Sequence, residues 1–163
     1  MRMADSAPAP PWGPPPSASG WRGVSLACDL ASAAVMSGVL ALVLLTFRDY
    51  GITWDETWHI VYGDHILEWF LTLGADTSAL CYRIDFLYGG AFDLLGAIAR
   101  RVSPLSDFDT IHLLGALVGV LGLLGTWRLA RRLGGPVAGL VAVVLLAATP
   151  VYYGNLFNNP KDL

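Results

Sequence analysis

An adjacent acidic pair, Asp55-Glu56, follows a long apolar segment by only a few residues. Carboxylates at a membrane edge are costly unless they meet water, a cation or a reacting group. Helical neighbours point about 100° apart, so these two acids cannot share one proton as a facing pair does. One could act as a general base while the other orients a partner. A helix start capped by Thr53 or Asp55 explains the same residues and stays open.

His59 follows Glu56 at the spacing i, i+3 and Asp55 at i, i+4. Both spacings place a carboxylate and an imidazole on one helix face, a geometry used in metal sites. A hydrogen-bonded histidine on an interfacial helix accounts for the same pattern and is favoured. His65 and His112 show no sequence partner and are interpreted as structural.

A second polar cluster, Asn158-Asn159-Pro160-Lys161-Asp162, ends the chain after another apolar segment. Pro160 limits helix continuation, and the cluster alone reads equally as a solvated helix end. A functional site requires Asp162 to lie near Asp55. Three membrane spans with a short inner turn would bring both clusters to the same face of the membrane.

The apolar residues predict an all-α, polytopic membrane protein. Of the 163 residues 55% are hydrophobic and 14% charged, and the charge-free runs are long enough to cross a bilayer. A formal net charge of −3 gives no nucleic-acid signature, and no P-loop, dinucleotide fingerprint, nucleophile elbow or zinc pattern is present. We expect three transmembrane helices, over 29–47, 109–127 and 137–152, with a turn at 134–136.

The remaining segments complete the predicted topology. Residues 1–25 are Pro/Ala-rich and predict a disordered cytoplasmic tail. The loop 48–108 contains two segments with helical apolar spacing, 54–73 and 84–102, which predict amphipathic helices at the membrane interface; helices of a water-soluble insert are the alternative. A compact arginine cluster, Arg128, Arg131 and Arg132, favours a cytoplasmic inner turn, with 48–108 and 154–163 on the outer face.

Taken together, the first span, the W-D-E of residues 54–56, the long loop and the hairpin ending in N-N-P-K-D resemble the membrane-embedded GT-C glycosyltransferases. Within that class the chain looks like the protein O-mannosyltransferase and aminoarabinose transferase branch, which uses dolichyl- or undecaprenyl-phosphate sugars. The resemblance covers about residues 26–163. Since those enzymes have about a dozen spans, it implies that this chain is an N-terminal part, inactive alone.

The resemblance implies roles for particular residues. Asp55 corresponds to the catalytic base that removes a proton from the acceptor hydroxyl, and Glu56 would assist or orient it. Asp162 matches a supporting acid near donor phosphate or metal. Lys161 could contact a phosphate, and His59 and Asn159 are expected to bind substrate.

The resemblance also implies the partners and the location. The donor would be a polyprenyl-phosphate-linked sugar, and the acceptor a hydroxyl of a protein, lipid or polysaccharide. Transfer would invert the anomeric centre at the outer face of the bacterial inner membrane. No cofactor is required, although a divalent metal ion fits the class.

Two other functions remain open from the residues. A non-enzymatic three-span scaffold would use a glycine stripe in the second span as its interface. A transport-related fragment would place polar residues inside the membrane, but the acids here lie outside the predicted spans. The stripe comprises Gly115, Gly119, Gly122 and Gly125.

Overall fold

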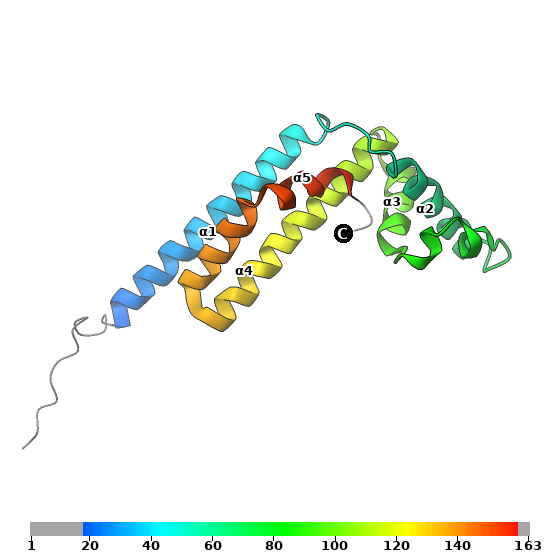
Figure 1. Ribbon diagram of the computed structural model, residues 1–163. Helices are drawn as coiled ribbons and strands as arrows, with labels where there is room; N and C mark the ends of the chain where they lie inside the picture. The colour runs from blue at the N-terminus through cyan, green and yellow to red at the C-terminus, as the bar shows by residue number, and fades with distance from the viewer. Residues whose placement is uncertain (1–17, 160–163) are drawn as a thin grey trace, which may run out of the picture.

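The computed structural model describes residues 18–159, and within that range the chain is helical and has no β-strand. The helices form an elongated bundle, and a smaller group of helices projects from one end of it (Figure 1). The all-α prediction is therefore confirmed for this range. The elements are α1 (Ala18–Thr46), α2 (Glu56–Leu71), η1 (Ser78–Cys81), η2 (Asp85–Leu87), α3 (Ala91–Val102), α4 (Asp107–Ala147) and α5 (Pro150–Asn158).

The first helix is longer than the sequence predicts. α1 begins at Ala18, whereas the predicted span begins at Asp29, so residues 18–25 are helical and their assignment to a disordered tail is wrong. Alanine and serine are compatible with a helix as well as with a tail, and composition alone does not separate the two states. Residues 1–17, the rest of the predicted tail, lie outside the described range.

α4 reverses direction at the predicted turn. Gly135 has φ 83° and ψ −176°, a backbone conformation that glycine adopts readily. Pro136 then suits the first turn of the returning limb, because its fixed φ is helical and it has no N–H to satisfy. Gly139 on the returning limb lies against Trp127 and Arg131 of the outgoing one, so the two limbs form a hairpin (Figure 1).

The returning limb is shorter than the predicted third span. The helix ends at Ala147, and Thr149 is extended with ψ 112° before Pro150 opens α5. The predicted third span, 137–152, is therefore divided between the returning limb of α4 and the first turn of α5. Proline has no backbone N–H to donate to the preceding helical turn, and its ring disfavours a helical conformation at the residue before it. These two effects explain the break at this position.

α5 fills the end of the bundle. Leu156 and Phe157 are 2% and 1% exposed and pack against Val43 of α1 and Ala116 of α4. This apolar cluster holds α5 beside the end of α1 and the first half of α4.

The insert, defined here as residues 48–106, contains the two predicted helices in shorter form. α2 lies within the predicted segment 54–73, whereas α3 covers only the second half of 84–102, since η2 and a turn occupy 85–90. The two helices pack where Gly63 meets the Asp93 carbonyl and Gly90 meets Ile66.

Two helices in the described range, Arg22–Thr46 and Asp107–Ala147, are long and apolar enough to cross a membrane. The second one contains the reversal at Gly135. Two helices could therefore span a membrane, while the count of three spans and the interfacial position of α2 and α3 stay predictions.

Candidate functional site

Asp55 lies at the N-cap position of α2, directly after the connection from α1. Its carbonyl accepts the first helical bonds, from the N–H groups of Trp58 at 2.9 Å and His59 at 3.2 Å, but its side chain does not cap the helix. The Thr53 hydroxyl donates to its carboxylate at 3.0 Å. The carboxylate of Asp55 is therefore half-buried at a helix start without being used in capping.

Glu56, the next residue, points into the protein. It is 1% exposed, and its Oε1 lies 3.2 Å from Nε2 of His112 on α4. Its Oε2 and Nδ1 of His112 are buried with no hydrogen-bond partner among the described residues. The two adjacent acids thus have different surroundings, as their divergent directions on a helix require. The interpretation of His112 as partnerless is wrong.

His59 forms a second buried histidine–carboxylate pair. Its Nδ1 lies 3.1 Å from Oδ1 of Asp93 on α3, and both side chains are about 95% buried. The hydrogen bond to Asp93 raises the pKa of His59 and burial opposes it, while the charges of Asp85 and Asp55 raise it further. His59 therefore joins α2 to α3, just as Glu56 joins α2 to α4.

The E-x-x-H pattern does not form a metal site in this arrangement. Glu56 and His59 share a helix but turn to different partners, and residues 18–159 contain no group of three His, Cys, Asp or Glu side chains that could hold a metal ion. A cavity of only about 10 Å³ separates the two pairs. That volume is near the minimum for one water molecule, so no substrate fits between them.

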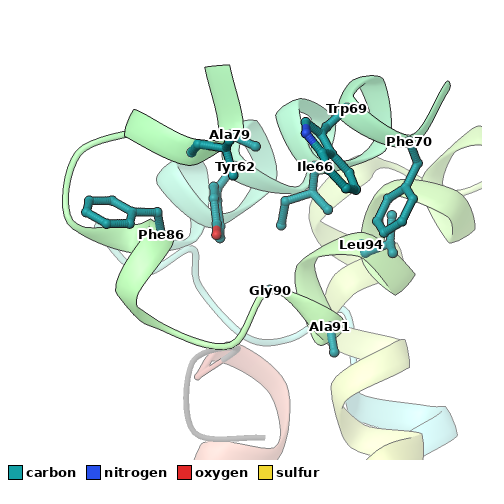
Figure 2. Close-up of a pocket in the computed structure, with 10 residues that line it drawn as sticks. Tyr62, Ile66, Trp69, Phe70, Ala79, Phe86, Gly90, Ala91 and Leu94 are labelled. Carbon is teal, nitrogen blue, oxygen red and sulfur yellow. The ribbon is translucent and has the colours of Figure 1, made fainter. Parts of the chain in front are cut away.

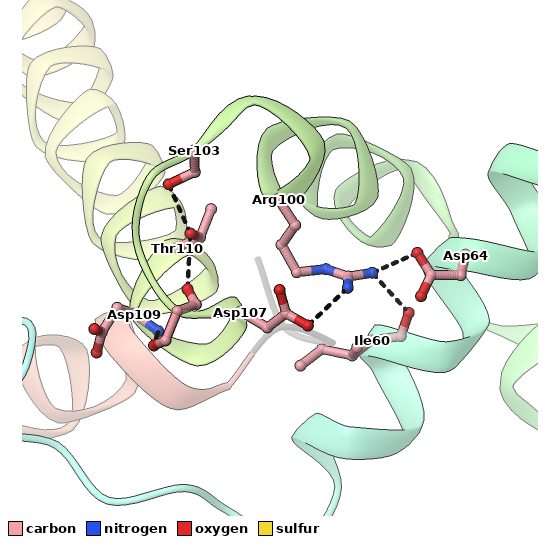
Figure 3. Close-up of polar contacts among 8 residues, drawn as sticks. Ile60, Asp64, Arg100, Ser103, Asp107, Asp109 and Thr110 are labelled. Carbon is pink, nitrogen blue, oxygen red and sulfur yellow. Dashed lines mark hydrogen bonds and ion pairs between the residues drawn. The ribbon is translucent and has the colours of Figure 1, made fainter.

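Arg100 fixes the insert to the bundle (Figure 3). Its side chain is 9% exposed, and its guanidinium donates to Asp64 at 2.6 Å and to Asp107 at 3.2 Å. It also donates to the Ile60 carbonyl at 3.2 Å. One side chain of α3 therefore binds both α2 and the start of α4. The helical pattern of residues 84–102 gave no sign of this role for Arg100.

The second polar cluster is described only as far as Asn159. Tyr50, from the connection after α1, stacks on Phe157 of α5 with 3.9 Å between ring centroids. Burial and the neighbouring Tyr153 raise the pKa of Tyr50 to about 12, so its phenol stays neutral. The segments that carry Asp55 and Asn159 therefore meet at one end of the bundle. Lys161 and Asp162 lie outside the described residues.

Two larger cavities are present, one in the bundle and one in the insert. One, of about 500 Å³, lies between α4 and α5 and is lined by Gly119, Tyr152, Asn155 and Asn159 among others. The other, of about 440 Å³, lies between α2 and α3 in the insert (Figure 2). Its walls are apolar apart from the hydroxyl of Tyr62 and the indole of Trp69. Both cavities have the size and apolar lining of small-molecule sites.

The chain was compared with protein-family models, with curated proteins and with solved structures, and none of them matches it significantly.

Proposed function

We propose that this chain is part of a membrane-embedded glycosyltransferase that moves a sugar from a polyprenyl-phosphate donor to a hydroxyl acceptor. Asp55 is the general base in this proposal. The enzyme works at the outer face of the bacterial inner membrane, with residues 48–108 and 154–163 on that face. The chain crosses the bilayer three times, and α2 and α3 lie at the interface.

The observation that carries the proposal is the stacking of Tyr50 on Phe157. It joins the segment after α1 to the segment after the hairpin, so both polar clusters begin at one end of the bundle. A lipid-linked donor presents its sugar at such an end, where apolar helices give way to polar groups. The acidic pair is where a transferase of this kind needs its base.

The proposed reaction is a single displacement. Asp55 takes the proton of the acceptor hydroxyl, whose oxygen forms a bond to the anomeric carbon of the sugar. The bond from that carbon to the phosphate oxygen breaks, and polyprenyl phosphate leaves with the electron pair. Because the attack comes from the face opposite the phosphate, the anomeric configuration inverts.

Burial supports a positioning role for Glu56 and His59 rather than direct contact with substrate. Glu56 is 1% and His59 6% exposed. Their pairing with His112 and Asp93 holds the first turn of α2 against α4 and α3. Asp55 immediately precedes this anchored turn, so its carboxylate is held at a defined place.

The polar groups around Asn159 suit substrate binding. Asn159 and Asn155 line the cavity of about 500 Å³ between α4 and α5, and their amides can hydrogen-bond sugar hydroxyls. Lys161 is assigned to the donor phosphate and Asp162 to its support. Since residues 18–159 do not fit a metal site, we derive no step through a metal ion.

The test is sugar transfer by the product of the complete gene, reconstituted in liposomes with polyprenyl-phosphate sugars. Removing a general base typically costs 10²–10⁴-fold in rate, so Asp55→Asn should reduce donor turnover by at least about 100-fold. Asp49→Asn is the matched control, because Asp49 is an exposed acid in the same connection. Equal turnover by wild type and Asp55→Asn would refute the proposal.

The scaffold alternative loses its interface in this structure. A Cβ on Gly119 would meet Leu156, and one on Gly122 would meet the Tyr152 hydroxyl. Tyr152 also donates to the Gly119 carbonyl at 2.6 Å. The middle of the glycine stripe therefore packs against α5 of the same chain, which favours the enzyme over a scaffold that needs this face for a partner.

A further inference from the structure

The turn end of the hairpin carries a compact group of cations that the proposed transfer reaction does not use. Arg128, Arg131 and Arg132 line one cavity of about 240 Å³ together with Trp127. This end of the bundle is opposite the insert (Figure 1). We propose that the cavity binds the phosphate of an anionic phospholipid.

The charges in this cavity are not balanced by the protein. Asp29 of α1 accepts two hydrogen bonds of 2.6 Å from Arg131, whose Nη2 also contacts Ser25. Within residues 18–159 no carboxylate forms an ion pair with Arg128 or Arg132. Three cations and one acid therefore leave a local charge of about +2, which favours an anion.

The geometry of Arg131 is already fixed for such a ligand. Asp29 engages its Nε and Nη2, so the guanidinium plane is held and its remaining nitrogen, Nη1, stays available. A phosphate oxygen is an acceptor for this donor.

The surroundings point to a lipid rather than to free phosphate. Leu129, Leu133 and Val137 lie near the arginines, on both sides of the turn, and are 61%, 80% and 50% exposed. Such a surface is stable against acyl chains and costly against water. A phospholipid can satisfy both surfaces at once, because its acyl chains cover the apolar residues while its phosphate meets the arginines. Basic pockets between transmembrane helices bind such headgroups.

The test uses the full 163-residue chain in nanodiscs of phosphatidylcholine with increasing phosphatidylglycerol. Brominated lipids quench nearby tryptophan, so the quenching that is lost in Trp127→Phe reports lipid at this site. We expect brominated phosphatidylglycerol to bind about tenfold more tightly than brominated phosphatidylcholine, and Arg128→Gln/Arg132→Gln to abolish the preference. Circular dichroism checks that the double variant retains its helices.

Arg48→Gln/Arg101→Gln is the matched control. It also removes two arginine charges, but these lie at the end of α1 and in α3 of the insert, away from the hairpin turn. It should keep the preference for phosphatidylglycerol. Equal quenching by the two lipids, or loss of the preference in the control, would overturn the proposal. So would displacement of the lipid by millimolar inorganic phosphate, since the site would then bind the free anion. None of these outcomes depends on sugar transfer, so this site and the proposed transferase activity can fail separately.

Discussion

In the bundle of α1, α4 and α5 the core cluster is apolar, whereas the insert buries titratable side chains beside its apolar ones. Val43, Ala116, Leu156 and Phe157 form the core of the bundle. The insert adds two histidine–carboxylate pairs and Arg100 to its apolar packing. Helices in a bilayer gain little from apolar contact and associate through close packing, and the close approach of α5 to Gly119 of α4 is a contact of this kind.

The difference has a consequence for the candidate site. Hydrogen-bonded pairs require a particular geometry, and removing one partner leaves the other buried without a hydrogen bond. Apolar cores tolerate substitutions that conserve side-chain volume. Asp55 lies at the junction of the two regions, where the connection from α1 enters α2. The chain therefore uses its directional contacts next to the residue whose position matters most for the proposed chemistry.

The largest expected effect is on the buried pair between Glu56 and His112. Glu56→Ala leaves His112 buried without its partner, and breaking a buried pair in this way costs about 3–5 kcal/mol. We expect α2 to detach from α4 and its amide hydrogens to exchange much faster. Hydrogen exchange followed by mass spectrometry measures this directly.

The matched control for Glu56 is Glu68→Ala. Glu68 also pairs with a cation, Arg101 at 2.9 Å, but both side chains are nearly half exposed. Exposed pairs contribute about 0–1 kcal/mol, so protection of α2 should change little. Similar exchange rates in the two variants would show that burial of the Glu56 pair does not hold the insert.

The next effect concerns the bundle. Gly119→Ala places a methyl group against Leu156, and overpacking of this kind costs about 1–3 kcal/mol. Gly125 is the matched control in the same helix, because nothing lies within 4 Å of an added Cβ there. We expect Gly119→Ala to lower the thermal unfolding temperature in detergent and Gly125→Ala to leave it unchanged or raise it.

If the two glycine variants shifted the unfolding temperature equally and in the same direction, helix propensity rather than packing would govern the stripe. The distinction matters for function, since a stripe that does not pack against α5 would be available to another protein. The scaffold alternative would then regain its interface.

The sequence predicted the features that depend on local signals. Gly135 and Pro136 predicted the reversal in α4, because glycine adopts a positive φ readily and proline fixes its own φ. The start of α1 was missed because the residues after Ala18 are common in tails and helices alike. Local composition does not distinguish the two.

The polar contacts of the insert could not be read from local patterns. Glu56 and His112 are 56 residues apart, and His59 and Asp93 are 34 residues apart. Such pairs depend on how α2, α3 and α4 pack, and one sequence carries no signal for that. Asp93 and Arg100 are seven residues apart on α3, a spacing that places two residues on one helix face but does not show which helix that face contacts.

A smaller effect separates two neighbouring arginines on α3. Arg100 is 9% exposed and contacts two helices, whereas Arg101 is 49% exposed and has one carboxylate partner. Arg100→Gln should cost about 1–3 kcal/mol of insert stability, and Arg101→Gln about 0–1 kcal/mol. Denaturant unfolding of the two variants measures the difference, and a larger loss for Arg101→Gln would contradict the network in Figure 3.

The smallest effect is a dependence of insert stability on pH. Because Asp93 raises the pKa of His59 in the folded chain, protonated His59 stabilises the insert. This contribution is complete below the unfolded pKa of about 6.5 and is lost as the pH rises through the folded value. His59→Gln removes it, so the stability difference between wild type and variant should shrink as the pH rises. His112 is present in both proteins and cancels from that difference. Thermal unfolding from pH 6 to pH 9 measures it, and a difference that stays constant with pH would show that His59 contributes by packing alone.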